Sequence, residues 1–501
     1  MEADYIVVGT GSAGAVVASQ LSAQPDVSVL ALEAGPRDRN KFIHIPAAFS
    51  KLFRSEVDWD YLTEPQPELD GRRIYWPRGK TLGGSSSMNA MMWVPGFPAD
   101  YDEWGDRAGA DWSYAGLEKY LKRIESGPLV IEAQRSPRGS TAAWLAAAEE
   151  CGHEGFRETR VTQRRGARWS TADAYLKPAL RRRNLSLLTE ATATRILFAG
   201  NRAVGVEYDR GGVRDVATAR REVILCGGAI NSPQLLMLSG VGDRDQLASH
   251  GIEVIRHVPG VGANLLDHLV VPLGFEVKND SLFAAEKPLE LVNYLTRRRG
   301  MLTSNVGEAY GFVRSRPDLE LPDLELIFAP APFFDEGIGD PYGHAIVMGP
   351  ILLKPRSTGT ITLRSADPMA KPVIDPRYLS DEADRTALMA GLRMSAEIAG
   401  APALKDVVGK VARPLDATTL DDETLARALN SVSHTLYHPV GTCRMGSDED
   451  SVVDPQLRVR GIESLRVADA SVMPTLIRGH THAPSVLVGE KAAELVIQGQ
   501  K

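Results

Sequence analysis

The fold is decided near the start of the chain, by the stretch Tyr5-Ile6-Val7-Val8-Gly9-Thr10-Gly11-Ser12-Ala13-Gly14. Its opening apolar run predicts a buried parallel strand, and residues 13–21 predict a helix. Between them, Gly9 permits a tight turn, Gly11 lets a pyrophosphate approach the backbone, and Gly14 lets the helix pack closely on the strand. The N-terminus of that helix offers free N–H groups and a positive dipole, which suit phosphate.

A second apolar run, Val27 to Leu32, ends at Glu33. An acid in this place accepts hydrogen bonds from a ribose diol and repels a 2′-phosphate. Strand, turn, helix, strand and acid in this order predict a Rossmann-like dinucleotide-binding domain. The pattern alone does not separate NAD from FAD.

Length and composition limit the class of protein. A chain of 501 residues is too long for one simple core, so we expect two closely packed domains. The net charge of −7 argues against nucleic acid as a partner. We expect no membrane span, because no run approaches the roughly 18 apolar residues that one needs. Cys151, Cys226 and Cys443 suggest buried, inert thiols rather than disulfides, which fits a reducing compartment and a cytoplasmic location.

Two further segments are rich in small residues. Residues 79–90, GKTLGGSSSMNA, offer backbone N–H and hydroxyl donors to a flavin and its phosphates. A flexible linker is the alternative, but residues 75–78 and 91–93 on either side look buried. Residues 228–242, GAINSPQLLMLSGVG, follow a predicted strand and contain a helix that Gly240 ends. Taken alone, this second segment also fits plain structural packing.

These two segments resemble the signature motifs of the glucose–methanol–choline (GMC) flavin oxidoreductases. The likeness continues through residues 264–268, 438–446 and 465–474, and it covers nearly the whole chain. In its site motifs the chain is most similar to aryl-alcohol oxidase and hydroxymethylfurfural oxidase-like members. The resemblance implies a bound FAD and a substrate domain over its isoalloxazine ring.

The resemblance also assigns cofactor-binding residues, position by position. They are Gly9, Gly11, Ser12, Gly14 and Glu33 at the ADP end, Gly83, Gly84, Ser87 and Asn89 beside the flavin and pyrophosphate, Thr194 near the adenine, Asp469 and Ala470 at the ribityl and pyrophosphate, and His482 at the pyrimidine edge. Met88 stands where choline oxidase carries a histidine that is covalently bonded to FAD. Methionine forms no such bond, so we predict non-covalent FAD.

Two histidines near the C-terminus match the family's catalytic positions. Oxidation of an alcohol removes a hydroxyl proton, for which histidine is the usual base, and a hydride, which the resemblance directs to flavin N5. His438, in YHPVGTCRMG, matches the base, and His480, in RGHTHAPS, matches the residue that orients the alcohol oxygen. We interpret the remaining histidines, including His44, His268 and His434, as structural. His480 and His482 have spacing that could bind a metal, but without a matching acid or thiol set we predict no metal.

The predicted function is oxidation of a primary alcohol, aromatic or allylic, to the aldehyde, with O2 or another acceptor reoxidising the flavin. Trp93 and Tyr437, each beside a flavin motif, are predicted to shape the pocket. Three alternatives stay open: a choline or aliphatic-alcohol dehydrogenase with a quinone-type acceptor, a hydroxynitrile lyase of the same fold without redox chemistry, and a flavin-binding protein without catalysis.

The expected fold class is α/β, with the Rossmann-like FAD-binding domain and a second domain built on an antiparallel sheet flanked by helices. The order of the motifs predicts an FAD-binding domain made from residues 1–130, 180–268 and 432–501. Residues 131–179 and 269–431 then form the substrate-binding domain.

Within the second domain, residues 323–328, 346–353 and 359–363 predict strands of one antiparallel sheet. Gly349-Pro350 should bend the second strand or place it at an edge. Residues 381–399 predict an amphipathic helix with an acidic first turn.

Overall fold

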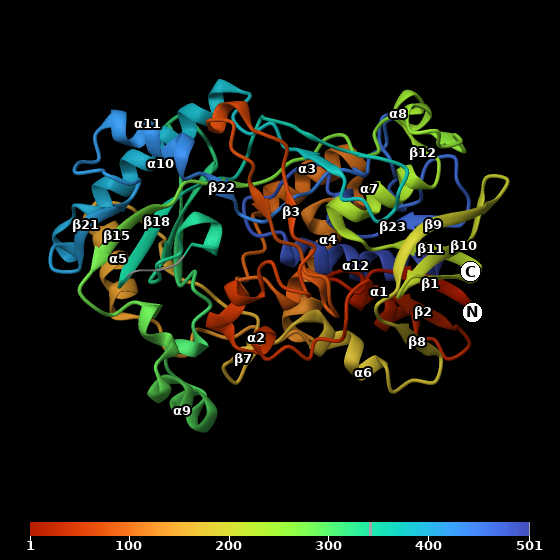
Figure 1. The fold of residues 1–501 in the computed structure, drawn as a ribbon, viewed down its shortest axis with the longest axis horizontal. Coiled ribbons are helices and arrows are strands. Elements are labelled where there is room, and N and C mark those ends of the chain that lie inside the picture. The colour runs from red at the N-terminus through yellow and green to blue at the C-terminus, as the bar shows by residue number, and fades with distance from the viewer. Residues whose placement is uncertain (340–342, 500–501) are drawn as a thin grey trace.

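Two large sheets organise the protein (Figure 1), whose computed structural model describes residues 1–339 and 343–499. The first sheet has the strand order β8-β2-β1-β11-β10-β9, with β23 also paired to β11. Its strands are β1 (Glu2–Val8), β2 (Val29–Leu32), β8 (Leu185–Leu188), β9 (Thr192–Ala199), β10 (Arg202–Arg210), β11 (Val213–Leu225) and β23 (Leu465–Val467). The pairs β1–β2, β1–β11, β2–β8 and β11–β23 are parallel, whereas β9, β10 and β11 are antiparallel.

Glycines allow the first strand and helix to meet as the sequence predicts. Gly9 follows β1 at a φ of +96°, where a Cβ atom would lie 2.5 Å from the carbonyl oxygen of Cys226. Gly14 opens α1 (Gly14–Leu21), and a Cβ atom there would lie 2.0 Å from the carbonyl oxygen of Gly9. Only a residue without a side chain fits either position, so the predicted strand–turn–helix unit is confirmed.

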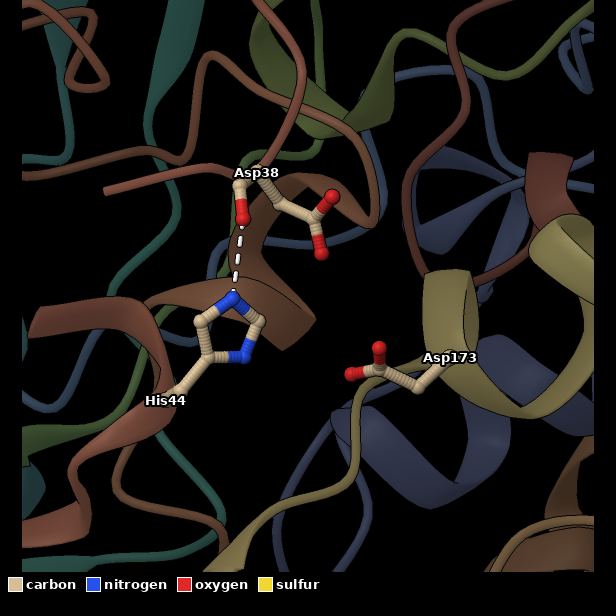
Figure 2. A group of neighbouring side chains, drawn as sticks. All are labelled: Asp38, His44 and Asp173. Carbon is tan, nitrogen blue, oxygen red and sulfur yellow. Dashed lines mark hydrogen bonds between the residues drawn. The ribbon is translucent and has the colours of Figure 1, made fainter. Parts of the chain in front are cut away.

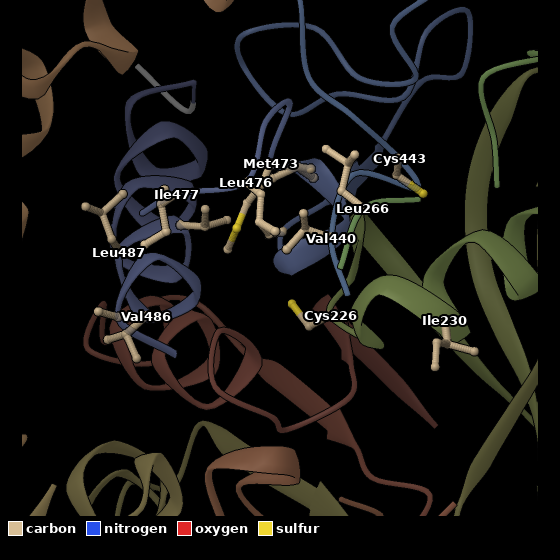
Figure 3. Packing of buried hydrophobic residues seen from close by; sticks show 14 of the residues in the cluster. Cys226, Ile230, Leu266, Val440, Cys443, Met473, Leu476, Ile477, Val486 and Leu487 are labelled. Atoms are coloured by element: carbon tan, nitrogen blue, oxygen red, sulfur yellow. The ribbon is translucent and has the colours of Figure 1, made fainter. Parts of the chain in front are cut away.

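The end of the chain completes the first sheet. β23 pairs with β11 from Val223 opposite Leu465 to Leu225 opposite Val467. The final helix, α12 (His482–Gln498), packs against α1, and most of its residues are buried. Cys226 and Cys443 lie in the apolar packing of this region, with Val440, Met473 and other apolar side chains (Figure 3).

The second sheet has the order β21-β15-β18-β17-β16-β5, and β14 joins both β18 and β22. The strands are β5 (Arg157–Glu158), β14 (Leu269–Val270), β15 (Leu273–Val277), β16 (Ala309–Val313), β17 (Leu324–Ala329), β18 (Ala345–Leu352), β21 (Val408–Arg413) and β22 (His434–Thr435). All these pairs are antiparallel. Helices α5 (Gly139–Glu150) and α10 (Glu382–Ala399) pack on this sheet, which confirms the predicted fold class.

The predicted edge position of Gly349-Pro350 is wrong, and the alternative, a bend of the strand, stays a prediction. β18 lies between β15 and β17. β18 pairs with β15 up to Met348 and with β14 at Ile351. Pro350 lies between these two pairings, where no backbone N–H is needed for a hydrogen bond on that side. A Cβ atom on Gly349 would lie 2.0 Å from the carbonyl oxygen of Val271, which explains the glycine.

The placement of residues 359–363 in the same sheet is also wrong. Their strand, β19 (Thr360–Thr362), pairs with β20 (Val373–Asp375) in a separate two-stranded sheet. The predicted helix at residues 381–399 is confirmed as α10, whose N-cap Asp381 accepts a hydrogen bond from the backbone of Ala383.

The remaining helices and short strands connect these layers. They are α2 (Lys41–His44), α3 (Pro98–Ala108), α4 (Tyr114–Ser126), α6 (Lys177–Ala179), α7 (Gly228–Leu238), α8 (Arg244–Ser249), α9 (Pro288–Arg297), α11 (Asp422–Ser431), β3 (Tyr61–Leu62), β4 (Tyr75–Trp76), β6 (Gln163–Arg164), β7 (Ala167–Arg168), β12 (Val241–Gly242) and β13 (Arg256–His257). In residues 1–339 and 343–499 we find no helix both long and apolar enough to cross a membrane. The domain boundaries and the cytoplasmic location stay predictions.

Candidate active site

A cavity of about 470 Å³ is lined by both sheets and by the segments between them. Its lining includes residues 8–13 after β1, residues 84–85 and 88–92 of the small-residue loop, the start of α7, and residues 436–439. The predicted dinucleotide turn and the two predicted catalytic histidines therefore open into one continuous space.

Glu33 closes the dinucleotide end of this cavity. Its Oε2 accepts hydrogen bonds from the backbone N–H of Thr10 at 3.0 Å and from the Thr10 hydroxyl at 2.7 Å, and its Oε1 accepts one from Gly35 at 2.9 Å. Burial raises the pKa of this carboxyl, and the three donors oppose that rise. The carboxylate is thus held facing the turn, as a ribose-binding acid requires.

The small-residue loop packs directly on the glycine turn. Gly84 has a φ of +52°, and a Cβ atom there would lie 2.7 Å from the Cα of Gly11. Asn89 in the same loop accepts a hydrogen bond from Arg168, whose guanidinium is fully buried. Burial lowers the pKa of Arg168 to about 9. Gly11, Gly84 and Asn89 all line the cavity.

Asp469 links the C-terminal segment to α7. Its Oδ2 accepts hydrogen bonds from the Ser232 hydroxyl at 2.6 Å and from the backbone of Gly228 at 2.9 Å. Its Oδ1 accepts hydrogen bonds from the backbone and hydroxyl of Ser471. Asp469 and its neighbour Ala470 line the cavity together.

His482 lies at the start of α12, near the C-terminus, and contacts the glycine turn near the N-terminus. Its Nδ1 is 3.1 Å from the hydroxyl of Ser12, and both residues line the cavity. Burial lowers the pKa of His482 to about 4, so the ring is neutral at physiological pH. Its buried Nε2 has no hydrogen-bond partner within the described residues, which leaves a polar atom for a ligand.

Five other predicted residues lie behind the cavity wall rather than in it: Gly14, Gly83, Ser87, Thr194 and Trp93. The Thr194 hydroxyl donates to Glu207, and the neighbouring Ala193 lines the cavity instead. The Trp93 indole donates to Glu125, and its ring lies edge-on to His482 at 6.1 Å. These residues support the wall through packing.

The two predicted catalytic histidines lie together. The ring centroids of His438 and His480 are 4.8 Å apart, with an interplanar angle of 70°. Nε2 of His480 lies 3.1 and 3.2 Å from the two carboxylate oxygens of Glu325, which is fully buried on β17. Because a carboxylate only accepts, this nitrogen carries a proton, and Nδ1 is left for a ligand.

A third histidine, His268, determines which nitrogen of His438 is basic. Nε2 of His268 lies 3.1 Å from the carbonyl oxygen of Leu353, which can only accept, so this nitrogen is protonated. Burial lowers the pKa of His268 to about 3, so the ring is neutral and its Nδ1 is an acceptor. That Nδ1 lies 2.9 Å from Nδ1 of His438, which must therefore donate. The lone pair of His438 is left on Nε2.

Hydrogen bonds also fix the backbone on both sides of the His438 ring. Asp267 accepts a hydrogen bond from its N–H at 2.8 Å, and Arg78 donates to the carbonyl of Tyr437 at 2.6 Å. Burial, followed by the neighbouring His480 and His268, lowers the pKa of His438 well below its usual value. The ring is therefore an unprotonated base at neutral pH.

The sequence alone does not reveal the contacts of His268 and Glu325. The interpretation of His268 as structural overlooks its place within the motif at residues 264–268. Glu325 lies in a predicted strand, where its charge amid apolar residues is the available signal. Both partners come from distant segments, so no local spacing connects them with His438 or His480.

Aromatic side chains line the cavity next to His438. The Tyr437 ring lies 5.9 Å from Phe53, which lies 5.8 Å from Phe49. Phe333 lies 5.8 Å from Phe49, and further apolar lining comes from Val270, Val306, Ile327, Ala329, Val347 and Leu436. Such walls favour a flat, apolar ligand.

The acids that line the cavity are already engaged. Within the described residues they are Glu33, Asp58 and Asp469. Asp58 accepts hydrogen bonds from the backbones of Arg54 and Arg78 and from the Tyr75 hydroxyl. Each of these carboxylates is thus held in place by donors of the protein itself.

Asp38, His44 and Asp173 form the group that most resembles a metal site within the described residues (Figure 2). Lys177 Nζ contacts Asp38 at 2.5 Å and Asp173 at 2.6 Å, while His44 Nε2 lies 2.9 Å from the Asp38 carbonyl oxygen. The ammonium group balances both carboxylates, so this is an ion-pair cluster.

The lining fits a flavin dinucleotide. It combines a glycine turn at a helix N-terminus without a side-chain cap, an acid for the ribose, and a buried His482 Nε2 without a partner. Glu33 and residues 9–13 would hold the ADP portion, and Asn89, Ala470 and His482 the flavin portion.

Comparison with known proteins assigns the family. The GMC oxidoreductase profile matches residues 3–270 with its N-terminal part and residues 355–489 with its C-terminal part. The chain is 68% identical to an uncharacterized GMC-type oxidoreductase of Mycobacterium tuberculosis, over 99% of each chain. It is 40% identical to an alcohol dehydrogenase [acceptor] of Pseudomonas putida, over 99% of this chain and 96% of that protein. It is also 40% identical to human mitochondrial choline dehydrogenase, over 100% of this chain and 90% of that protein.

Solved structures share the fold. Pyridoxine 4-oxidase from Mesorbium loti superposes with a TM-score of 0.90 at 29% identity, over 99% of both chains. A fungal aryl-alcohol oxidase superposes with a TM-score of 0.85 at 24% identity, again over 99% of both. At that identity, the second likeness shows the fold alone.

Proposed function

Because the chain belongs to the GMC oxidoreductase family, whose members use FAD to oxidise CH–OH groups, we propose that it oxidises a neutral, apolar primary alcohol to the aldehyde. Aromatic and allylic alcohols are the proposed substrate class. The observation that carries the proposal is the pairing of His438 with His480 beside an aromatic wall.

In this proposal, Nε2 of His438 takes the hydroxyl proton. His480 donates a hydrogen bond to the alcohol oxygen from Nδ1, as an imidazolium whose other N–H is held by the Glu325 carboxylate, and His268 is a positioning residue that acts through His438. FAD, when bound, supplies the acceptor for the hydride that leaves the alcohol carbon. The aromatic side chains hold the substrate and exclude water from it.

Anaerobic mixing of the purified holoenzyme with benzyl alcohol tests this proposal. We expect rapid bleaching of the oxidised-flavin absorbance, and its recovery rate in air then tells whether O2 is the acceptor. The His438→Ala variant should bleach about 10²–10⁴-fold more slowly. Unchanged bleaching in that variant contradicts the role of His438, and no bleaching by any aromatic or allylic alcohol contradicts the substrate class.

Choline oxidation is the second candidate, since human choline dehydrogenase is a relative. The apolar lining beside His438, which includes Val270, Val306 and Ile327, favours a neutral alcohol. Choline in the same anaerobic assay distinguishes the two, since bleaching by choline but not by benzyl alcohol reverses the preference. Cleavage of mandelonitrile without bleaching would instead support the lyase alternative.

We also propose that FAD is bound non-covalently. Met88 lines the cavity at the position that carries the covalent histidine in choline oxidase, and its thioether packs with Ile43, Leu52 and Val57. Acid precipitation of the protein should therefore release all flavin into the supernatant. Flavin that remains on the polypeptide would refute this.

A further inference from the structure

Helix α9 (Pro288–Arg297) turns its apolar face to the outside. Its exposed apolar side chains, with their exposed fractions, are Leu289 (76%), Leu291 (45%), Val292 (55%) and Leu295 (61%). Phe283, in the short 3-10 helix Leu282–Glu286 just before α9, is 41% exposed. Figure 1 shows α9 projecting from the body of the molecule at its lower edge.

The opposite face of α9 is polar and holds the helix in place. Glu290 accepts a hydrogen bond from the backbone N–H of Met301 at 2.8 Å. The buried Tyr294 donates its hydroxyl hydrogen to the carbonyl of His44 at 3.1 Å. The apolar face is therefore not the face that binds the rest of the protein, and it has no partner among residues 1–339 and 343–499.

Cations surround this apolar face. Lys287 precedes the helix, and Arg297, Arg298 and Arg299 end it, all of them exposed. A second basic segment lies beside them, since Arg135 Nε donates to the carbonyl of Arg298 at 3.0 Å. A Cβ atom on Gly166 would lie 2.9 Å from that same oxygen, which places the loop of Arg164 and Arg165 here too.

Within the described residues, Arg135 is the one of these cations that pairs with an acid, Glu132 at 4.0 Å. Glu286 pairs with Lys51 at 2.6 Å, and Glu290 points inward to Met301. The whole chain carries a net charge of −7, so the basic cluster is a local feature that contrasts with the rest of the protein.

We propose that α9 and the basic residues around it form a docking surface for a membrane that contains anionic lipids. An interfacial helix inserts its apolar side chains at the level of the acyl chains, while flanking Lys and Arg contact the headgroups. A second protein is less well matched, since a stable interface buries about 800 Å² per partner, more than the apolar face of one projecting ten-residue helix offers.

The base of this surface continues into the wall of the active-site cavity. Leu282, Ala285, Met301 and Leu302 belong to the same apolar cluster as Phe49, Val306 and Phe333. Those last three residues line the cavity. Docking through α9 therefore brings the apolar wall of the catalytic site near the lipid.

Cosedimentation of the holoenzyme with vesicles tests the proposal. Vesicles of phosphatidylglycerol and phosphatidylcholine should pellet the protein at low salt, and pure phosphatidylcholine vesicles should pellet much less. The triple variant Leu289→Ser, Val292→Ser, Leu295→Ser should bind anionic vesicles at least about tenfold more weakly. The double variant Arg297→Gln, Arg299→Gln should lose most of the preference for anionic vesicles.

A matched control removes exposed apolar side chains elsewhere. Val213 and Leu415 are 66% and 62% exposed, so Val213→Ser, Leu415→Ser should bind vesicles as the wild type does. FAD content and Tm, measured for each variant, verify that it is folded. Failure of the wild-type protein to bind anionic vesicles overturns the proposal, and so does an unaffected triple variant. Light scattering that shows a dimer dissociated by the triple variant also overturns it, in favour of a second copy of this chain.

Discussion

A catalytic base must direct its lone pair at the substrate, and His268 determines which nitrogen of His438 carries that lone pair. Nδ1 of His268 accepts a 2.9 Å hydrogen bond from the N–H at Nδ1 of His438, because the one proton of the His268 ring is on Nε2 and faces the Leu353 carbonyl. Without this acceptor, the His438 ring is free to adopt the other tautomer, whose lone pair points away from the substrate.

We therefore predict that His268→Leu lowers the rate of anaerobic flavin reduction by about 10²-fold or more. His268→Asn is the matched control, because the amide oxygen can take the place of the Nδ1 acceptor and should restore much of the rate. The apparent Kd for the alcohol should change little in either variant. Equal rates for the Leu and Asn variants would show that His268 only fills space.

The low pKa of His438 predicts how activity depends on pH. A depressed pKa means that the ring takes up a proton only at more acid pH, so the neutral base persists as the pH falls through 6.5. We expect kcat/KM with benzyl alcohol to stay level from pH 8 to below 6.5 and to fall only in more acid solution. An acid limb at or above pH 6.5 would contradict the burial of His438, provided that the flavin spectrum shows an intact holoenzyme throughout.

At the scale of elements, the approach of α1 to β1 depends on one missing side chain. We predict that Gly14→Ala abolishes or severely weakens FAD binding, because its Cβ atom would lie 2.0 Å from the carbonyl oxygen of Gly9. Gly400→Ala, after α10, is the control, since its Cβ atom would meet nothing closer than 3.5 Å. The ratio of flavin to protein absorbance measures both. Full FAD content in Gly14→Ala would show that the turn can relax.

Elements with a strong local signal were predictable from sequence, and those defined by distant partners were not. The glycine turn and α10 carry their own start and stop residues, so both were predicted. Gly349-Pro350 has the local signal of an edge, yet β18 is central. Its neighbour changes from β15 to β14 at that point, and no sequence pattern within β18 records this change.

The same contrast holds within the site. The family and the flavin-binding motifs follow from contiguous stretches, so the assignment to GMC oxidoreductases is confirmed. His268 and Glu325 act only through side chains that are 170 and 155 residues away along the chain. Their roles become visible only when the two sheets are assembled.

At the scale of the whole molecule, the cofactor cavity joins both sheets, so bound FAD should stabilise the entire fold. We predict that the Tm of the apoprotein rises as FAD is added. At a free FAD concentration of 100 Kd, binding should stabilise the folded state by about 2.7 kcal/mol. Riboflavin lacks the ADP portion that the glycine turn and Glu33 would hold, so the same concentration should raise Tm far less. Equal shifts with both ligands would contradict the assignment of the dinucleotide end.

The pairing of β23 with β11 and of α12 with α1 has a consequence for biosynthesis. Ser12 and His482, which lie 3.1 Å apart in the cavity wall, are separated by 470 residues of chain. While the ribosome is still making the last helix, the glycine turn already exists but lacks the segment that closes it. We therefore expect nascent chains that lack the C-terminal helix to retain no flavin, so that loading of the cofactor follows release of the finished polypeptide.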